Sequence, residues 1–333
     1  MKEDDINPNF YFHSLSRLIR KHTKVREEKP KKRALLIGIN YVGQAHTLSG
    51  CYNDVEEMKK YLEKVGFDEF MVMTDEQTGD LYPTKVNICK AFRWLVADAH
   101  PHDTFFLHFS GHGGSIKDED GDESDGYDET LFPVDYLQEG VLVDDDIHMM
   151  VVKTLPPGSK LTSVFDCCHS GSLLDLPYTY NSNGKLVTNV DQDKLHIFSS
   201  SGKEIFRAFK RGDSSSALLE FKNAMNSLKG MTKEQREAAH KKTIQTRTTL
   251  AQVIMFSGCK DYQLAADTEI NGKVRGAMSH NLLGLLNEKD DWVLIDLLKE
   301  LQKNMQFKFA QSPQLSTGYE MDITVEKFSF FDV

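Results

Sequence analysis

The chain has 333 residues, of which 40% are hydrophobic and 27% are charged, as in ordinary globular proteins. Its 50 acidic side chains outnumber its 40 basic ones, and the net charge of −10 disfavours general binding to nucleic acid. No apolar run approaches the roughly 18 residues of a membrane-spanning helix, and the acidic start MKEDDINPNF is unlike a secretory signal. The five cysteines form no Cys-x-x-Cys pair. We therefore expect a protein of the reducing cytoplasm, and by extension of the nucleus, with neither nucleic acid nor membrane as a partner.

Short apolar runs alternate with amphipathic segments from residue 32 onward. The runs KRALLIGIN (32–40) and FMVMT (70–74) predict buried strands. Between them, the spacing of apolar side chains predicts a helix. Asn53 or Asp54 can serve as its N-cap, and Gly66 is expected to end it.

A second helix is predicted from Thr84, which follows Pro83 and can cap it, to about Ala97. The run DTFFLHFSG (103–111) predicts a third strand, within which His108 is expected to pack in the core. The succession strand, helix, strand, helix, strand with short connections is typical of a parallel sheet with right-handed crossovers.

The second half continues this pattern less regularly. An acidic loop, the apolar run LFPVD, a helix that begins near Asp144 and a strand at 160–166 come first. From about 175 to 248 the pattern weakens, and residues 202–247 carry 11 basic against 5 acidic side chains. The pattern resumes with a strand at 251–258, a helix capped by Ser279, a helix from about Trp292 to Met305 and a final strand near 319–325.

Cys167 and Cys168 come directly after the strand at 160–166, and His112 follows the strand at 103–111. Because ligands of parallel α/β sheets bind outside the carboxyl ends of the strands, topology alone brings these groups to one edge. A thiol nucleophile needs a neighbouring base, which His112 can supply from the segment SGHGG. Adjacent side chains of an extended chain face opposite sides, so only one of the two cysteines can share a cleft with His112.

Seven short segments stand in order along the chain: LLIGINY (35–41), SGCYND (49–54), HFSGHGG (108–114), DGYDE (125–129), VDDDIH (143–148), DCCHSG (166–171) and GAMSH (276–280). Together they resemble the metacaspases, a family of caspase-like cysteine peptidases. The resemblance implies a caspase-like fold, which is a three-layer α/β/α sandwich with a mostly parallel central sheet. It also implies a dyad in which Cys168 is the nucleophile and His112 the base, with Cys167 as a small buried neighbour.

The resemblance further implies cleavage of proteins after Arg or Lys, in a pocket made by Cys51, Asp54, Ser110 and Asp166. Two partly desolvated carboxylates at Asp54 and Asp166 suit a guanidinium, which carboxylates bind in bidentate geometry. For Asp54 the alternative is the helix-capping role, and the two roles are compatible.

The segment DEDGDESDGYDE (118–129) places eight carboxylates in twelve residues. It is not an EF-hand loop, because Glu123 stands at the sixth position, where glycine is required. The resemblance implies that Ca²⁺ is a cofactor bound by Asp128, Asp144 and Asp145. The alternative is a solvated acidic loop followed by aspartates that stabilise a helix N-terminus. We prefer this alternative for residues 118–125 and calcium for the three named aspartates.

The same resemblance divides the chain into a leader or pro-segment (1–31), a large p20-like catalytic portion (32–205), a basic linker (206–248) and a small p10-like portion of the same domain (249–333). The enzyme is expected to be a monomeric zymogen that cuts its own linker. The candidate processing residues are the basic ones of this region, namely Arg207, Lys210, Arg211, Lys241, Lys242 and Arg247.

The sequence therefore predicts a calcium-dependent cysteine endopeptidase, with cell death and protein quality control both open as its setting. One alternative is a catalytically silent or weakly active interaction module of the same fold, although both members of the dyad are present. Another is a different caspase-clan peptidase, such as a paracaspase or a legumain-like enzyme. The acidic loop and the segment VDDDIH argue against this last alternative.

Overall fold

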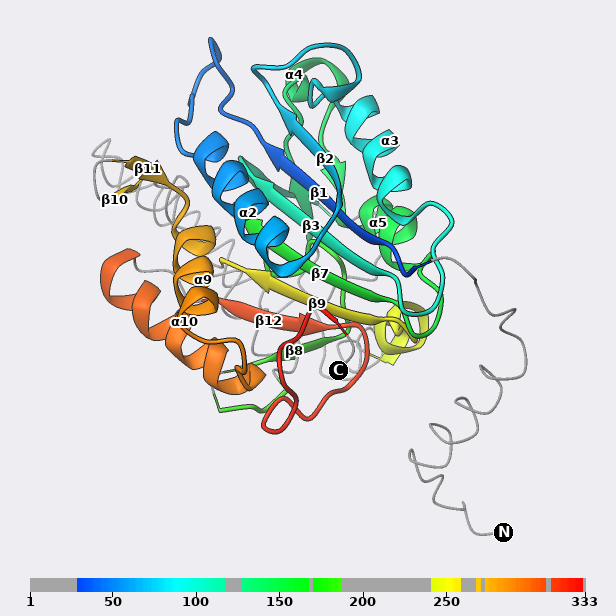
Figure 1. The fold of residues 1–333 in the computed structure, drawn as a ribbon. Helices are drawn as coiled ribbons and strands as arrows, with labels where there is room; N and C mark the ends of the chain where they lie inside the picture. The colour runs from blue at the N-terminus through cyan, green and yellow to red at the C-terminus, as the bar shows by residue number, and fades with distance from the viewer. Residues whose placement is uncertain are drawn as a thin grey trace, which may run out of the picture.

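The computed structural model describes residues 29–117, 127–167, 170–181, 183–186, 241–258, 268–270, 273–309 and 313–331. Helices cover both faces of a seven-stranded central sheet, so the described chain forms a three-layer α/β/α sandwich (Figure 1). The expected fold class is confirmed. The leader up to residue 28, most of the acidic loop and the linker up to residue 240 lie outside the described residues.

The central sheet has the strand order β2-β1-β3-β7-β9-β12-β8. Its strands are β1 (Lys32–Gly38), β2 (Glu69–Thr74), β3 (Thr104–Ser110), β7 (Lys160–Asp166), β8 (Tyr178–Tyr180), β9 (Gln252–Ser257) and β12 (Gln314–Thr317). The first five in spatial order are parallel, β12 pairs antiparallel with β9, and β8 pairs antiparallel with β12. The sequence predicted the parallel part, because each of its strands is a continuous or nearly continuous apolar run.

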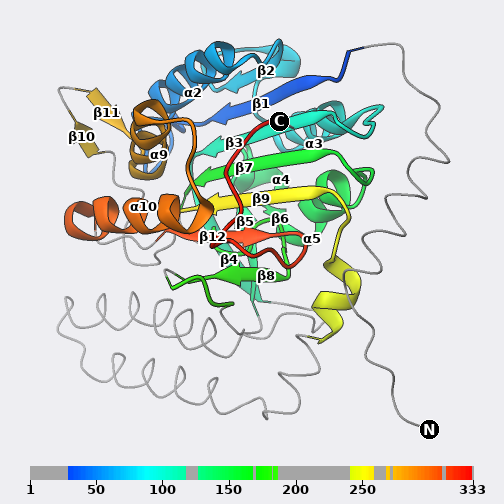
Figure 2. The same cartoon turned by 60° about the horizontal axis from the view of Figure 1, so that its bottom comes forward.

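One face of the sheet is covered by α2 (Cys51–Val65), α9 (Ala277–Glu288) and α10 (Leu294–Phe309), and the other by α3 (Lys85–Val96) and α5 (Asp144–Ile147) (Figure 2). The π-helical turn η2 (His148–Val152) continues α5. The short elements η1 (Gly79–Leu81) and α4 (Tyr136–Glu139) lie in connecting segments. None of the described helices is both long enough and apolar enough to cross a bilayer.

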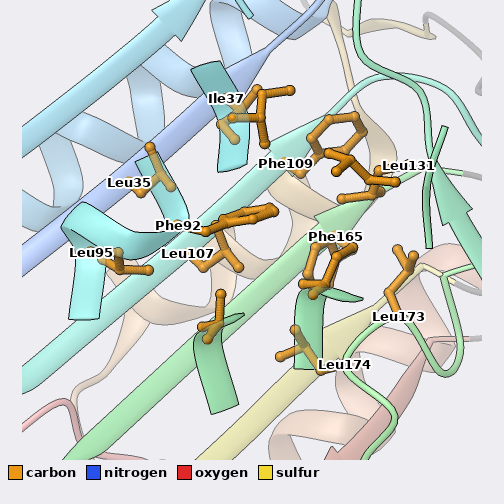
Figure 3. Packing of buried hydrophobic residues seen from close by; sticks show 14 of the residues in the cluster. Leu35, Ile37, Phe92, Leu95, Leu107, Phe109, Leu131, Phe165, Leu173 and Leu174 are labelled. Carbon is orange, nitrogen blue, oxygen red and sulfur yellow. The ribbon is translucent and has the colours of Figure 1, made fainter. Parts of the chain in front are cut away.

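Alternate residues of each strand enter two separate apolar clusters. Leu36 of β1 and Phe106 of β3 pack on the side of α2 and α9. Leu35 and Leu107 point the other way, toward Phe92 of α3, as Figure 3 shows. This two-residue period is that of a strand with both faces buried.

Two small sheets stand beside the central one. The first contains β4 (Gly113–Lys117), β5 (Tyr127–Leu131) and β6 (Leu142–Val143) in antiparallel order. The second is the hairpin of β10 (Thr268–Ile270) and β11 (Lys273–Arg275), which leads through Gly276 into α9. Each comes after a strand of the central sheet, since β4 follows β3 and β10 follows β9 along the chain.

The expected caps of two helices are wrong. Helix α2 begins at Cys51 with Gly50 as its N-cap, because the side chains of Asn53 and Asp54 bind other elements. The Asn53 amide donates to the carbonyl of Val274 at 2.8 Å. Helix α9 begins at Ala277 with Gly276 as its N-cap, so Ser279 lies inside the helix and not before it.

The expected final strand near 319–325 is also wrong. The last strand is β12, which ends at Thr317, and residues 323–325 form a turn. Ile323 is buried in the apolar cluster under α10, and its carbonyl accepts from the amide of Ile295 at 3.0 Å. The apolar pattern of this segment therefore reflects packing against α10 and not strand pairing.

The N-cap of α3 can be tested by mutation. The Thr84 side chain accepts from the amide of Asn87 at 3.3 Å, as the sequence predicts. Thr84→Ala should lower the free energy of unfolding, measured by urea denaturation, by about 1 kcal/mol. Thr84→Ser, which keeps the hydroxyl, should stay close to the native value. Equal loss in both variants would contradict the capping role.

Candidate active site

The two halves of the candidate dyad follow strands that are neighbours in the central sheet. Ser110, the last residue of β3, pairs with Asp166, the last residue of β7. The amide of Gly111 donates to the carbonyl of Asp166 at 3.4 Å. His112 and Cys168 each stand two residues beyond this pair. The register supports their convergence, although Cys168 itself lies outside the described residues.

His112 is held by an aromatic ring and a backbone carbonyl. Its ring stacks on Tyr41 with 4.5 Å between the ring centroids, and its amide donates to the Tyr41 hydroxyl oxygen at 2.9 Å. Its Nε2 atom lies 2.7 Å from the carbonyl oxygen of His46. Because a carbonyl only accepts hydrogen bonds, Nε2 carries the proton and Nδ1 is the basic nitrogen. The contact therefore fixes the tautomer of the ring as well as its orientation.

The loop that carries Tyr41 and His46 has an uncommon backbone conformation. The φ angles of these two residues are 53° and 62°, in a region that residues other than glycine rarely adopt. Asp75 braces the loop by accepting from the amide of Asn40 at 2.8 Å, and the Tyr41 hydroxyl donates to the carbonyl of Phe132 at 2.7 Å. Such conformations persist where neighbouring contacts enforce them, and they are frequent at functional sites.

Two buried carboxylates lie side by side at the same edge of the sheet. Asp54 of α2 accepts from the Ser110 hydroxyl at 2.7 Å and from the amide of Gly276 at 2.8 Å. Asp166 accepts from the amide of Ser279 at 2.7 Å. Both carboxylates thus bind amides at the N-terminus of α9, where a helix carries a partial positive charge.

Burial raises the pKa of both carboxyls. For Asp54, the charge of Asp166 raises it further, whereas hydrogen bonds from Ser110 and Gly276 oppose the rise. For Asp166, hydrogen bonds from the first turn of α9 oppose the rise. No described basic side chain forms an ion pair with either group. A buried carboxylate pair that has no fully charged positive partner is a favourable binding site for a cation.

Gly276 allows α9 to approach the pair closely. A Cβ atom at this position would lie 2.7 Å from Oδ2 of Asp54 and closer still to Oδ2 of Asp166. Any side chain here would push the carboxylates away from the amides that they bind. This is a position where the absence of a side chain matters, and the backbone φ is ordinary.

A buried histidine supports the same helix. Nε2 of His108 lies 2.8 Å from the Ser279 hydroxyl oxygen, and burial lowers the pKa of His108 to about 3. The neutral ring can therefore donate to Ser279, whose amide in turn binds Asp166. The expectation that His108 packs in the core is confirmed, since the residue is fully buried.

The two described cysteines of the predicted site are both buried. Cys51 opens α2, in the turn that carries Asp54, and its amide donates to the side-chain oxygen of Asn40 at 3.1 Å. Cys167 packs in the apolar cluster on the α3 side of the sheet. The interpretation of Cys167 as a small buried side chain is therefore confirmed.

Acidic side chains gather where β5 meets the start of α5. Asp128, Glu129 and Asp144 are buried, and the Asp144 carboxylate accepts from the amides of Glu129 and Asp145, each at 2.9 Å. Burial raises the pKa of Asp144 to about 10, with further contributions from the charges of Glu129 and Asp175. We call Asp128, Glu129, Asp144, Asp145 and Asp175 together the acidic cluster.

Arg247 lies against this cluster. Its guanidinium forms ion pairs with Asp145 and with Asp175, the latter at 2.8 Å. Within the described ranges, no three His, Cys, Asp or Glu side chains converge as a ready-made metal site. The positive charge beside Asp145 and Asp175 is thus supplied by the chain itself, through the Arg247 guanidinium.

The predicted residues fall into three sets. Cys51, Asp54, Ser110, His112 and Asp166 lie at the carboxyl edge, Asp144 and Asp145 open α5, and Asp128 lies on β5, which pairs with β6 just before α5. Of the candidate processing residues, Lys241 and Lys242 are exposed on a helix over 241–247, whereas Arg247 at its end is only 9% exposed. Arg207, Lys210 and Arg211 lie outside the described residues.

Several participants are absent from the sequence-based prediction. The His46 carbonyl leaves no trace in the sequence, because every residue has one. Asp175 did leave a signal, since an aspartate inside the apolar run LLDLP is expected to be buried with a partner. Gly276 and Ser279 stand in the segment GAMSH, where only a helix cap was expected.

Comparison with known proteins identifies the relatives of this chain. The family described as "Metacaspase, peptidase C14 domain" matches residues 32–177. The chain is 42% identical over 304 residues to Metacaspase-1B of Aspergillus fumigatus, covering 89% of this chain and 71% of that protein. It is 43% identical over 300 residues to Metacaspase-1B of Neosartorya fischeri, covering 87% and 70%. It is 41% identical over 304 residues to Metacaspase-1A of Aspergillus terreus, covering 89% and 72%.

A solved structure of protein GSU0716 from Geobacter sulfurreducens is also similar. The TM-score is 0.55 at 23% sequence identity, and the match covers 90% of this chain and 97% of that one. At this identity the likeness concerns the fold alone.

The close approach of α9 to the carboxylate pair predicts the effect of two matched substitutions. Gly276→Ala should lower the free energy of unfolding by about 1–3 kcal/mol, because the new methyl group overlaps both carboxylates. Gly284→Ala, on the same helix with no atom within 4 Å of the new Cβ, should raise it by up to about 1 kcal/mol. Denaturant unfolding measures both. A neutral or stabilising effect at position 276 would contradict the packing described.

Proposed function

The chain belongs to the metacaspase family of cysteine-type endopeptidases, and from this premise we propose a calcium-dependent enzyme that cleaves proteins after Arg or Lys. Cys168 and His112 form its dyad in this proposal. The observation that carries the specificity is the buried pair of Asp54 and Asp166, for which the described chain offers no basic partner. Membership of this family excludes the paracaspase and legumain-like alternatives.

The proposed reaction is acyl transfer. Nδ1 of His112 takes the proton of the Cys168 thiol, and the thiolate attacks the carbonyl carbon of the scissile bond. His112 then gives this proton to the leaving amine as the carbon–nitrogen bond breaks, which leaves a thioester on Cys168. Water attacks the thioester while His112 accepts its proton. As the carbon–sulfur bond breaks, His112 returns this proton to the sulfur, and the acid product leaves.

The contacts of His112 support its role as the base. The His46 carbonyl binds the Nε2 proton, so the imidazolium that forms during the reaction keeps a hydrogen-bond acceptor on the side away from Nδ1. Stacking on Tyr41 limits rotation of the ring. Both contacts lower the cost of orienting the base before the substrate arrives.

The basic P1 side chain is proposed to enter between Asp54 and Asp166. In the structure described, the amides of α9 supply only partial positive charge to this pair. A guanidinium carries a full charge and presents several donors in one plane, so it is the stronger partner for two carboxylates. Ser110 fixes one of them through its hydroxyl, and Cys51 completes the wall in the first turn of α2.

Calcium is proposed to bind at the acidic cluster, through Asp128, Asp144 and Asp145. We add Asp175 to this set, because it binds the same guanidinium as Asp145. Carboxylate oxygens from separate segments suit a hard cation with flexible coordination. Bound calcium would supply the charge that allows Asp144 to ionise in a buried position.

Processing is proposed within the linker at 206–248, in a monomeric cytoplasmic zymogen. Lys241 and Lys242 are accessible in the described chain, whereas the side chain of Arg247 is buried and is not available to enter the pocket. This region is rich in Lys and Arg, the residues that the pocket is proposed to prefer at P1.

A peptidase assay tests the proposal. A fluorogenic peptide with Arg at P1 should be cleaved in calcium and not in chelator. Cys168→Ala should lower kcat/KM at least about 1000-fold, as the loss of a nucleophile does. Cys167→Ala, the matched control, should keep activity within about threefold, because this side chain is buried in the apolar cluster on the α3 side of the sheet. If calcium-treated protein cleaves no basic substrate, the chain is instead the catalytically silent module considered above.

The raised pKa values of Asp54 and Asp166 predict a pH effect on specificity. Recognition of a P1 cation requires both carboxyls ionised, so the negative charge of the pocket is lost as pH falls through their raised pKa values. The ratio of kcat/KM for P1 Arg to that for its neutral isostere citrulline should therefore fall as the pH is lowered, and it should begin to fall while ordinary exposed aspartates, whose pKa is about 3.9, are still ionised.

The pH dependence of the dyad itself does not affect this ratio, because the same dyad cleaves both substrates. Asp166→Asn should lower kcat/KM for the substrate with Arg at P1 by about tenfold to a hundredfold. It should also flatten the pH dependence of the ratio. A ratio in the native enzyme that stays constant down to about pH 5.5 would mean that the pocket carboxyls titrate like ordinary exposed ones.

A further inference from the structure

The Arg247 guanidinium is bound by two carboxylates that belong to different parts of the chain. Nε lies 2.8 Å from Oδ2 of Asp175, and Nη2 forms an ion pair with Oδ1 of Asp145. The residue is 9% exposed and Asp175 is 4% exposed. Two donor atoms of one guanidinium therefore bridge a buried carboxylate, Asp175, and a half-buried one, Asp145, and the pair with Asp175 is poorly screened.

The three residues join the linker to the body of the enzyme. Arg247 ends the helix over 241–247, Asp145 stands in the first turn of α5, and Asp175 lies seven residues after Cys168. The Lys153 ammonium donates to the carbonyl of Thr246 at 3.2 Å, at the same helix end. Arg247 is thus the buried anchor of the segment that leads into β9.

We propose that the acidic cluster is a binding site for the chain's own guanidinium, and that calcium binds by displacing Arg247 from Asp145 and Asp175. This inference rests on the calcium site of the proposed function. Both cations need the same carboxylate oxygens, so they exclude each other. Calcium carries twice the charge of the guanidinium and takes six to eight oxygen ligands, so it can engage carboxylates that Arg247 does not reach.

Displacement changes two regions at once. It frees the helix over 241–247 from the body, which exposes the peptide bond after Arg247 to the enzyme's own pocket. It also changes the partner of Asp175 in the loop that follows the nucleophile. That loop is tied to the acidic cluster by a hydrogen bond from the Ser172 hydroxyl to Glu129. One event therefore couples calcium binding to the loop after Cys168 and to the linker.

The competition is measured directly by calcium titration. The full chain carrying Cys168→Ala, which cannot cut itself, is titrated with Ca²⁺ by isothermal calorimetry. Addition of Arg247→Ala should tighten calcium binding at least about tenfold, because a competitor that occupies the site most of the time is removed. Arg247→Lys, whose ammonium is a point charge without the guanidinium fork, should give an intermediate affinity.

The matched control is Lys242→Ala. Lys242 lies on the same helix and is exposed, so its removal changes the net charge equally without vacating the cluster. Its calcium affinity should equal that of the parent chain. If Lys242→Ala tightens binding as much as Arg247→Ala, the effect is general electrostatics and the proposal fails.

A second readout keeps Arg247 in place. Hydrogen exchange of the Cys168→Ala chain should show faster exchange of amides over 241–250 in Ca²⁺ than in Mg²⁺ or chelator. Calcium binding with neither this change nor tighter binding by Arg247→Ala would overturn the displacement. If Arg247→Ala fails to fold, the exchange result decides alone. A parent chain that binds no calcium would instead refute the calcium site of the proposed function.

Discussion

Two like charges buried at the carboxyl edge of the sheet constrain the rest of this structure. Asp54 and Asp166 come from α2 and β7, and burial alone would make their ionised forms costly. The N-terminus of α9 compensates them, because its amides donate to both carboxylates. The helix is consequently fixed against the sheet at the point where the substrate pocket is proposed, and Gly276 is needed for the approach. The fold and the proposed specificity therefore depend on the same interaction.

The same physical arrangement occurs a second time, at the acidic cluster. There the compensating charge is a full one, supplied by Arg247 to Asp145 and Asp175. In both places the chain stabilises carboxylates with a positive partner of its own, and in our proposal a stronger cation replaces or supplements this partner. At the pocket the proposed external cation is the basic P1 side chain of the substrate. At the acidic cluster it is calcium. Specificity and regulation would then follow from one principle, namely exchange of an internal partner for an external cation.

The sequence predicted the elements whose signals are local. The central strands are continuous apolar runs, and Thr84 caps α3 with the amide of a residue three positions on. The prediction failed where side chains bind distant partners. Asp54 and Ser279 have the chemistry of helix caps, but Asp54 binds Ser110 and Ser279 binds His108. The ion pairs of Arg247 join residues far apart in sequence, so no local pattern could reveal them.

The central claim is that Asp54 and Asp166 select a basic side chain for attack by Cys168. A crystal structure of the enzyme inactivated by a peptidyl chloromethyl ketone with Arg at P1 tests it most directly. The account predicts a covalent bond to the sulfur of Cys168, with the P1 guanidinium hydrogen-bonded to both carboxylates. A guanidinium bound away from the pair, or a covalent bond at Cys167, would contradict it.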